Sequence, residues 1–209
     1  DWSSDVCSSD LTEVYVGFPG TWRFRMALLA PDQYAWTIYT SGQPDHYLFD
    51  GTAARVFVNG QEVASEAAAT APLRSHARFM AVINLDALRR PGVEVAPLPP
   101  TSRSAGASEG LLVTFADDGA RYRLGFDRGG RLVSATGPLD LPPFGSGEVT
   151  AHLSDFRTVS GRVLPHQVHY EFGGAPLADE RLLSACLDDP RFTAAAFQRP
   201  GLIPECAPP

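Results

Sequence analysis

Thr21-Trp22-Arg23-Phe24-Arg25-Met26 is the most informative stretch of the chain, because its apolar and charged residues alternate. The apolar side chains occupy even positions and the two arginines odd positions, which is the two-residue period of a β-strand with one apolar face. Gln33 to Tyr39 repeats the pattern after a break at Ala30-Pro31-Asp32 that suits a hairpin connection. One apolar wall is therefore predicted, formed by Trp22, Phe24, Met26, Tyr34, Trp36 and Ile38.

The neighbouring segments extend this pair of strands into a meander. A strand is predicted at Thr12 to Phe18, and two more at His46 to Phe49 and Ala53 to Val58. The last two are followed by Asp50-Gly51 and Asn59-Gly60, which are strong hairpin signals.

The period changes at Ala71, where a helix is predicted to run to Arg90. Pro72 suits a first helical turn, and Pro91-Gly92 stops the segment. A wide apolar stripe on this helix must be covered, and the aromatic wall is the simplest cover. The helical residues predicted to face a ligand beside that wall are Phe79, Met80 and Ile83.

The second half of the chain is again predicted to consist of strands, after an exposed loop at Pro97 to Glu109. An irregular connection is expected at Pro138 to Gly147, a short helix at Arg191 to Phe197 and a Pro-rich tail at 198–209. The predicted strands are Val93 to Ala96, Gly110 to Ala116, Ala120 to Phe126, Arg131 to Thr136, Gly147 to Phe156, Arg162 to Phe172 and Leu177 to Leu187. Because they can complete the first sheet, residues 12–197 are expected to form a single domain.

Residues 1–11 match, letter for letter, the translation of a common short-read sequencing adapter. We interpret them as a non-native segment and set them aside. A signal peptide is then presumed to be lost from the sequence upstream of about Leu11.

Composition excludes several classes of function. The chain has 209 residues and a formal net charge of −7, or −4 without the three aspartates of residues 1–11, which argues against a nucleic-acid partner. All 17 basic residues are Arg, so neither a P-loop lysine nor a Schiff-base lysine is present. No apolar run is long enough to cross a bilayer, and no cofactor is expected.

Cysteine leaves two interpretations open. With Cys7 set aside, Cys186 and Cys206 remain, and in an oxidising compartment they can form a disulfide that ties the tail to the sheet. Alternatively, Cys186 is a small buried apolar residue and Cys206 a free thiol.

The candidates for chemistry are weak. Gly106 to Gly110 matches the G-x-S-x-G pattern around Ser108, but a loop precedes it and a strand follows, whereas a nucleophile elbow needs a strand and then a helix. His166 and His169 point to opposite faces of a strand, which disfavours a metal site. His152 and His169 can approach across the hairpin, where hydrogen bonding at the surface is the favoured role.

The pattern of strands and helix resembles the LolA/LolB-like superfamily of lipoprotein carriers over most of Thr12 to Phe197. Three features carry the resemblance: Tyr34-Ala35-Trp36 in a strand that follows a proline, Asp50-Gly51 before Ala54-Arg55-Val56-Phe57, and the later Ser154-Asp155-Phe156-Arg157 and Val159 to His166. It implies a mainly β (α+β) fold, a half-open antiparallel β-barrel with a lid or plug helix, whose concave apolar face receives acyl chains. It also implies export to the periplasm, either free or as a lipoprotein anchored to the outer membrane.

One position departs from the family. An arginine that serves in handing over cargo stands before the strand-starting proline in the carrier itself, and Ala30 occupies that place here. We therefore expect a monomeric, non-enzymatic envelope protein that binds a lipid or lipoprotein acyl chain, without assigning it the specific carrier cycle. The alternatives are an envelope interaction or sensor protein of the same fold with a protein partner and a filled core, and a hydrolase that uses Ser108.

Overall fold

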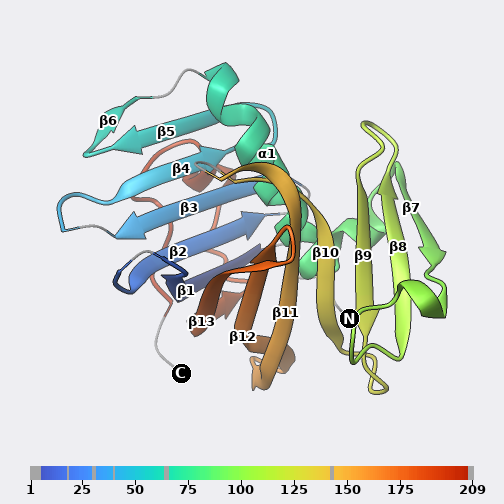
Figure 1. The fold of residues 1–209 in the computed structure, drawn as a ribbon. Coiled ribbons are helices and arrows are strands. Elements are labelled where there is room, and N and C mark those ends of the chain that lie inside the picture. The colour runs from blue at the N-terminus through green and yellow to red at the C-terminus, as the bar shows by residue number, and fades with distance from the viewer. Residues whose placement is uncertain are drawn as a thin grey trace.

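The computed structural model describes residues 6–17, 19–29, 32–39, 41–63, 66–141 and 144–206. Within these ranges thirteen strands form one antiparallel sheet that is not closed into a barrel, with one long helix, α1, on its concave side (Figure 1). The first strands are β1 (Val6–Tyr15), β2 (Trp22–Leu29), β3 (Gln33–Tyr39), β4 (Asp45–Phe49), β5 (Ala54–Val58) and β6 (Gln61–Glu62), followed by α1 (Glu66–Ile83). The remaining strands are β7 (Val93–Pro97), β8 (Glu109–Phe115), β9 (Arg121–Phe126), β10 (Leu132–Leu141), β11 (Gly145–Val159), β12 (Arg162–Phe172) and β13 (Ala175–Leu187). Short 3₁₀ helices lie at Asp86–Arg89, Pro100–Ser102 and Ala194–Phe197.

The order of the strands explains where α1 lies. Two meanders, β1 to β6 and β7 to β13, are joined edge to edge by pairing of β1 with β13, so β6 and β7 are the outer edges. The chain must pass from one outer edge to the other, and α1 makes that crossing over the concave face (Figure 1). The half-open barrel with a lid helix that the sequence predicts is therefore confirmed.

The sheet is irregular at several points, and these add to its curvature. The pairing register shifts at Asp10/Leu11 in β1, at Leu132/Ser134 in β10 and at Tyr170/Glu171 in β12. In β11, Asp155 adopts a left-handed backbone conformation with φ 49°.

Three predicted boundaries are wrong. The helix begins at Glu66 rather than Ala71, so Pro72 lies in its interior, and it ends at Ile83. The alanine-rich residues before Pro72 favour helix strongly enough to extend it upstream. The expected irregular connection at Pro138 to Gly147 is instead largely strand, because β10 continues to Leu141 and β11 starts at Gly145.

Pro138 is tolerated in β10 because of where the pairing with β9 stops. The last β9 partner pairs with Thr136, so beyond that point one side of β10 has no neighbouring strand. The helix occupies this side, where the backbone N–H of Asp140 donates to Ser75 Oγ at 3.0 Å. The same bond fixes α1 to the sheet.

The first strand also differs from its predicted span. It was predicted at Thr12 to Phe18; Phe18 lies outside the described residues, and β1 covers Val6–Tyr15. The strand thus includes part of the segment that we set aside. Leu11 is buried in the apolar core, and Asp10 is buried on the opposite face.

Apolar side chains pack on both sides of the first meander. On the concave side, Phe24, Tyr34 and Phe49 pack against Leu73 and Ala77 of α1. On the convex side, Ala27, Ala35, Leu48 and Phe57 are covered by residues of the C-terminal segment, namely Phe192, Ala196, Phe197 and Ile203. A third cluster joins the C-terminal half of α1 to β8–β13.

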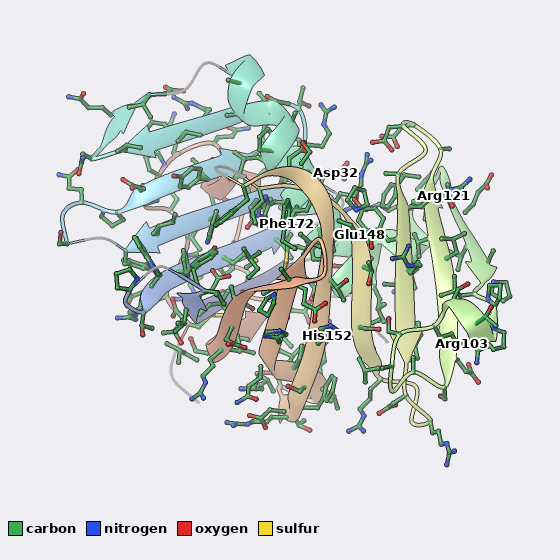
Figure 2. All side chains as sticks on the ribbon, in the orientation of Figure 1. Asp32, Arg103, Arg121, Glu148, His152 and Phe172 are labelled. Carbon is green, nitrogen blue, oxygen red and sulfur yellow. A yellow bond between two sulfur atoms is a disulfide. The ribbon has the colours of Figure 1, made fainter. Side chains whose placement is uncertain are left out.

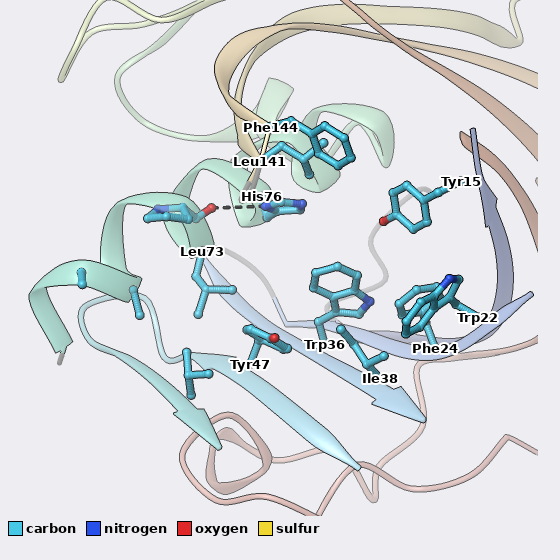
Figure 3. A pocket seen from close by; sticks show the side chains of 14 residues that line it. Tyr15, Trp22, Phe24, Trp36, Ile38, Tyr47, Leu73, His76, Leu141 and Phe144 are labelled. Atoms are coloured by element: carbon cyan, nitrogen blue, oxygen red, sulfur yellow. Dashed lines mark hydrogen bonds between the residues drawn. The ribbon is translucent and has the colours of Figure 1, made fainter. Parts of the chain in front are cut away.

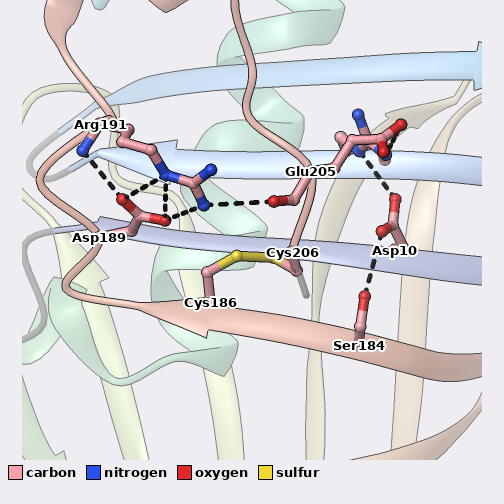
Figure 4. Close-up of a disulfide and its surroundings, with 8 residues drawn as sticks. Asp10, Ser184, Cys186, Asp189, Arg191, Glu205 and Cys206 are labelled. Carbon is pink, nitrogen blue, oxygen red and sulfur yellow. Dashed lines mark hydrogen bonds and ion pairs between the residues drawn. A yellow bond between two sulfur atoms is a disulfide. The ribbon is translucent and has the colours of Figure 1, made fainter. Parts of the chain in front are cut away.

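A disulfide fixes the C-terminal segment to the sheet. Cys186 at the end of β13 is bonded to Cys206, and their Cα atoms are 5.4 Å apart (Figure 4). Of the two interpretations that the sequence left open, the structure has the disulfide. It lies close to the buried ion pair between Arg25 and Asp10 (Nε to Oδ1, 2.8 Å).

Candidate ligand-binding cavity

A cavity of about 420 Å³ lies between the N-terminal half of α1 and the concave face of the first meander (Figure 3). Its sheet wall is formed by Trp22, Phe24, Trp36, Ile38, Tyr47 and Val56. Its helix wall is formed by Ala68, Ala69, Pro72, Leu73 and His76, and its remaining side by Tyr15, Leu141 and Phe144. Trp22 and Phe144 are each 38% exposed, so these two aromatic side chains mark the mouth of the cavity.

Aromatic contacts hold the sheet wall in place. The ring of Trp36 lies 5.2 Å from that of Phe24 and 5.5 Å from that of Tyr47, measured between centroids. These three side chains come from adjacent strands, because Trp36 pairs with Met26 of β2 and with Tyr47 of β4. Such offset contacts fix the ring orientations, so the wall is preformed.

His76 is the most polar side chain on the helix wall. Its ring lies 5.7 Å from that of Trp36 and 6.1 Å from that of Tyr34. Nδ1 is 3.3 Å from the carbonyl oxygen of Pro72, one helical turn earlier. Burial among these rings lowers the pKa of His76 to about 4, so the imidazole is neutral at physiological pH.

A smaller cavity of about 50 Å³ continues beneath α1 and shares Tyr15, Phe24, Trp36 and His76 with the larger one. Two carboxyl groups, Glu13 of β1 and Glu180 of β13, line it. Burial raises the pKa of Glu13 to about 7 and that of Glu180 to about 8. A third cavity of about 70 Å³ extends farther along the helix.

The nine residues that the sequence singled out lie along this series of cavities. Trp22, Phe24, Trp36 and Ile38 line the cavity of about 420 Å³. Met26, Tyr34, Phe79 and Met80 line the second, and Ile83 lines the third. Tyr34 and Phe79 are 1% and 2% exposed, so they act mainly as core between the sheet and α1.

Several lining residues were missed by sequence reasoning. Tyr47 and Val56 could have been found, because they continue the lateral row that starts at Trp36. Ala69 and Leu73 precede His76 at helical spacing on α1. Leu73 lies within the predicted helix, and extending that helix upstream would have included Ala69. Phe144 was assigned to a loop, and Tyr15 was not considered as part of the wall.

The weaker candidates for chemistry are placed elsewhere. Ser108 lies just before β8, and its Oγ donates to the carbonyl oxygen of Phe126 at 3.2 Å. Arg103 donates to the carbonyl oxygen of Ser108, which fixes this loop at the β8 side of the molecule (Figure 2). None of these residues lines the large cavity.

The two histidines of the β11–β12 hairpin lie at the surface. His152 of β11 and His169 of β12 are direct cross-strand partners, with ring centroids 6.1 Å apart. His169 Nδ1 lies 2.9 Å from Asp179 Oδ1, and His152 Nε2 lies 3.6 Å from Glu171 Oε1. Within the described ranges, no group of three or more His, Cys, Asp or Glu side chains is arranged to hold a metal ion.

Comparisons with solved structures identify the fold. The chain is similar to a LolA superfamily protein from Nitrosomonas europaea, with a TM-score of 0.58 and 12% identity over 95% of this chain and 91% of that one. It is also similar to a DUF1329 family protein from Desulfovibrio piger, with a TM-score of 0.50 and 11% identity over 96% and 92% of the two chains. The fold is therefore LolA/LolB-like, as the sequence predicted.

Sequence comparisons add nothing to this assignment. No family model matches the chain. No curated protein matches it either.

In the parts of the chain that the structure describes, no helix is both long and apolar enough to span a membrane. Ala30, where the resemblance led us to look for an arginine, lies outside the described residues.

Proposed function

We propose that this protein binds the acyl chain of a lipid or lipoprotein in the cavity between α1 and the first meander, and carries it within the bacterial envelope. The observation that carries this proposal is a cavity of about 420 Å³ whose walls are almost entirely aromatic and aliphatic. This volume lies in the range of small-molecule sites. The LolA-like fold of the chain supports the same function.

Hydrocarbon burial supplies the affinity in this proposal. Each Å² of apolar ligand surface removed from water contributes roughly 25 cal/mol, so an alkyl chain needs few polar contacts to bind. Stacking contacts, such as that between Phe24 and Trp36, already order the side chains of the aromatic wall. Ligand binding therefore costs little additional side-chain conformational entropy.

Binding rather than catalysis is proposed. Ser108, the one candidate nucleophile, lies in the loop before β8 and outside the cavity wall. A single molecule of the protein holds its ligand, since one chain builds the whole cavity. Transfer of cargo to a partner, the step that the arginine serves in the lipoprotein carrier, is not assigned to this protein.

The disulfide supports a location in the envelope. Disulfides persist in oxidising compartments such as the bacterial periplasm, and the Cys186–Cys206 bond ties the C-terminal segment to β13. Thiol alkylation of periplasmic and cytoplasmic fractions of the native host tests this location. Protein found only in the cytoplasmic fraction, with both thiols alkylated, would contradict it.

Blocking the cavity tests the binding proposal. Ala69 is buried and lines the cavity, whereas Ala71 lies two residues farther along α1 and is exposed. Ala69→Trp fills the cavity, and Ala71→Trp is the matched control with the same substitution on the same helix. Organic extracts of the wild-type and variant proteins are compared by mass spectrometry, and binding of 1-dodecanol is measured by titration.

We expect lipid in the wild-type and Ala71→Trp extracts and at least about tenfold less in the Ala69→Trp extract. Circular dichroism establishes that both variants are folded. Lipid-free wild-type protein that also fails to bind dodecanol would exclude the carrier function and favour an interaction protein of the same fold.

A further inference from the structure

His76 presents an unpaired hydrogen-bond acceptor to the apolar cavity. Its Nδ1 faces the carbonyl oxygen of Pro72, which can only accept, so Nδ1 must carry the proton. In a neutral imidazole the other nitrogen, Nε2, is then an acceptor. Within the described part of the chain, Nε2 has no hydrogen-bond partner.

The ring is held in this orientation from two sides. It stacks against Trp36 and Tyr34, at 5.7 and 6.1 Å between centroids, and is bonded to its own helix through Pro72. Figure 3 shows the ring extending from α1 into the cavity, with its free edge on the side of Phe144 and Trp36. Nε2 is therefore a fixed feature of the wall.

Whether His76 Nε2 receives a hydrogen bond depends on the ligand that fills the cavity. An alkyl chain that fills the space separates Nε2 from solvent and leaves it unpaired, which is unfavourable for a buried polar group. A ligand that places a hydroxyl or an amide N–H beside Nε2 avoids this cost. Sites built to receive such a donor discriminate strongly against analogues that lack it.

We propose that the cavity is specific for an amphiphile that carries a hydrogen-bond donor, a hydroxyl or an amide N–H, next to its hydrocarbon chain, and that His76 Nε2 receives this donor. This inference rests on the proposed function, because it names the class of ligand that the same cavity takes. His76 acts here as a specificity-determining residue.

Two neutral probes with the same alkyl chain separate the hydrogen bond from hydrocarbon burial. 1-Dodecanol carries a donor, and its methyl ether does not. Their affinities are measured for the wild-type protein, for His76→Phe and for His46→Phe. Phenylalanine keeps a ring that can stack on Tyr34 and Trp36, and His46, bonded to Thr37 at 3.1 Å outside the cavity wall, is the matched control.

We expect the wild-type protein to bind the alcohol about tenfold more tightly than the ether. The preference should disappear in His76→Phe and persist in His46→Phe. A second measurement needs no variant: the ¹⁵N resonance of His76 Nε2 in the wild-type protein should shift on adding the alcohol and stay in place on adding the ether.

Equal affinities of the wild-type protein for the two probes would overturn this inference and leave the proposed function standing. A preference that survives in His76→Phe, or an Nε2 resonance that the alcohol does not move, would also overturn it. Binding of neither probe would overturn the proposed function as well.

Discussion

Glu13 of β1 and Glu180 of β13 are direct cross-strand partners, so two carboxyl groups lie side by side at the seam that joins the meanders. Glu13 is buried, Glu180 is half-buried, and both line the small cavity under α1. The other titratable groups of that cavity are Tyr15, Tyr34, Tyr170 and His76. Since His76 is neutral, no cation in this wall offsets two negative charges.

This pair makes stability fall as the pH rises. Burial raises the pKa of Glu13 from 4.5 to about 7 and that of Glu180 from 4.5 to about 8, so the folded state retains protons that the unfolded state has lost. The destabilisation begins near pH 4.5 and grows until the pH has passed about 8. We expect Tm to drop by at least about 3 °C between pH 5 and pH 9.

Glu180→Gln should reduce this drop, because an uncharged amide keeps no titrating proton. The exposed Glu94→Gln is the control and should leave the drop unchanged. Scanning calorimetry at several pH values measures both. A wild-type Tm that stays constant from pH 5 to pH 9 would show that the pair is not protonated in the folded state.

The Cys186–Cys206 disulfide is expected to contribute substantially to stability. It closes a loop of 20 residues, for which loss of chain entropy in the unfolded state corresponds to about 3 kcal/mol. The double variant Cys186→Ser/Cys206→Ser should therefore unfold at a lower urea concentration than the wild-type protein. Reductant should produce the same loss in the wild type and none in the variant, and identical midpoints under all conditions would refute the prediction.

Arg25, on the convex face of the sheet, is expected to contribute strongly to the stability of the folded protein. Its guanidinium is bonded to Asp10 (2.8 Å) and Glu205 (3.1 Å), and Ser184 also donates to Asp10 (3.1 Å). Removing one partner of a buried ion pair leaves an uncompensated charge, so Arg25→Met should cost about 3 kcal/mol. The exposed Arg23→Met, two residues away on the same strand, is the control, and an equal loss of stability in both variants would contradict this role.

The sequence predicted the local features of this fold and missed the long-range ones. The alternation in β2 and β3 places Phe24 and Trp36 on the concave face as expected, because side chains of successive residues in a strand point to opposite faces. Arg25 was expected on a charged face and is 7% exposed, since the C-terminal segment covers it. No local pattern indicates that cover.

The polar groups of the cavity could not be predicted for a similar reason. Glu13 meets Glu180 only because β1 pairs with β13, and register between strands so far apart in sequence leaves no periodic signal. The role of His76 could not be predicted either, because it depends on stacking with Trp36 and on the bond to Pro72. The alternating pattern of the strands predicted the aromatic wall, but it could not predict the cavity between that wall and α1.

Replacement of Gly137 in β10 is predicted to lower the stability of the folded protein. A Cβ at this position would lie 2.1 Å from Cδ1 of Tyr122. That ring is 1% exposed and packs at 6.2 Å from Phe79 and 5.6 Å from Phe115, so it cannot move aside. Gly137→Ala should cost about 2 kcal/mol through overpacking. Gly42→Ala, where the nearest atom is a side-chain oxygen of Asn59 at 3.4 Å, is the control, and equal urea midpoints of the two variants would refute the prediction.

Substitution of Trp22, at the mouth of the cavity, is expected to weaken ligand binding with little effect on stability. It is 38% exposed, so its removal uncovers little core, whereas a ligand in the cavity would cover its ring. Trp22→Ala should weaken dodecanol binding about fivefold, equivalent to about 1 kcal/mol, with a change in Tm of less than about 2 °C. Val14→Ala, at a residue that is 45% exposed and outside the cavity wall, is the matched control and should change neither quantity. If Trp22→Ala binds as tightly as the wild-type protein, the mouth lies elsewhere, because a side chain that borders the entry of an alkyl chain must contact it.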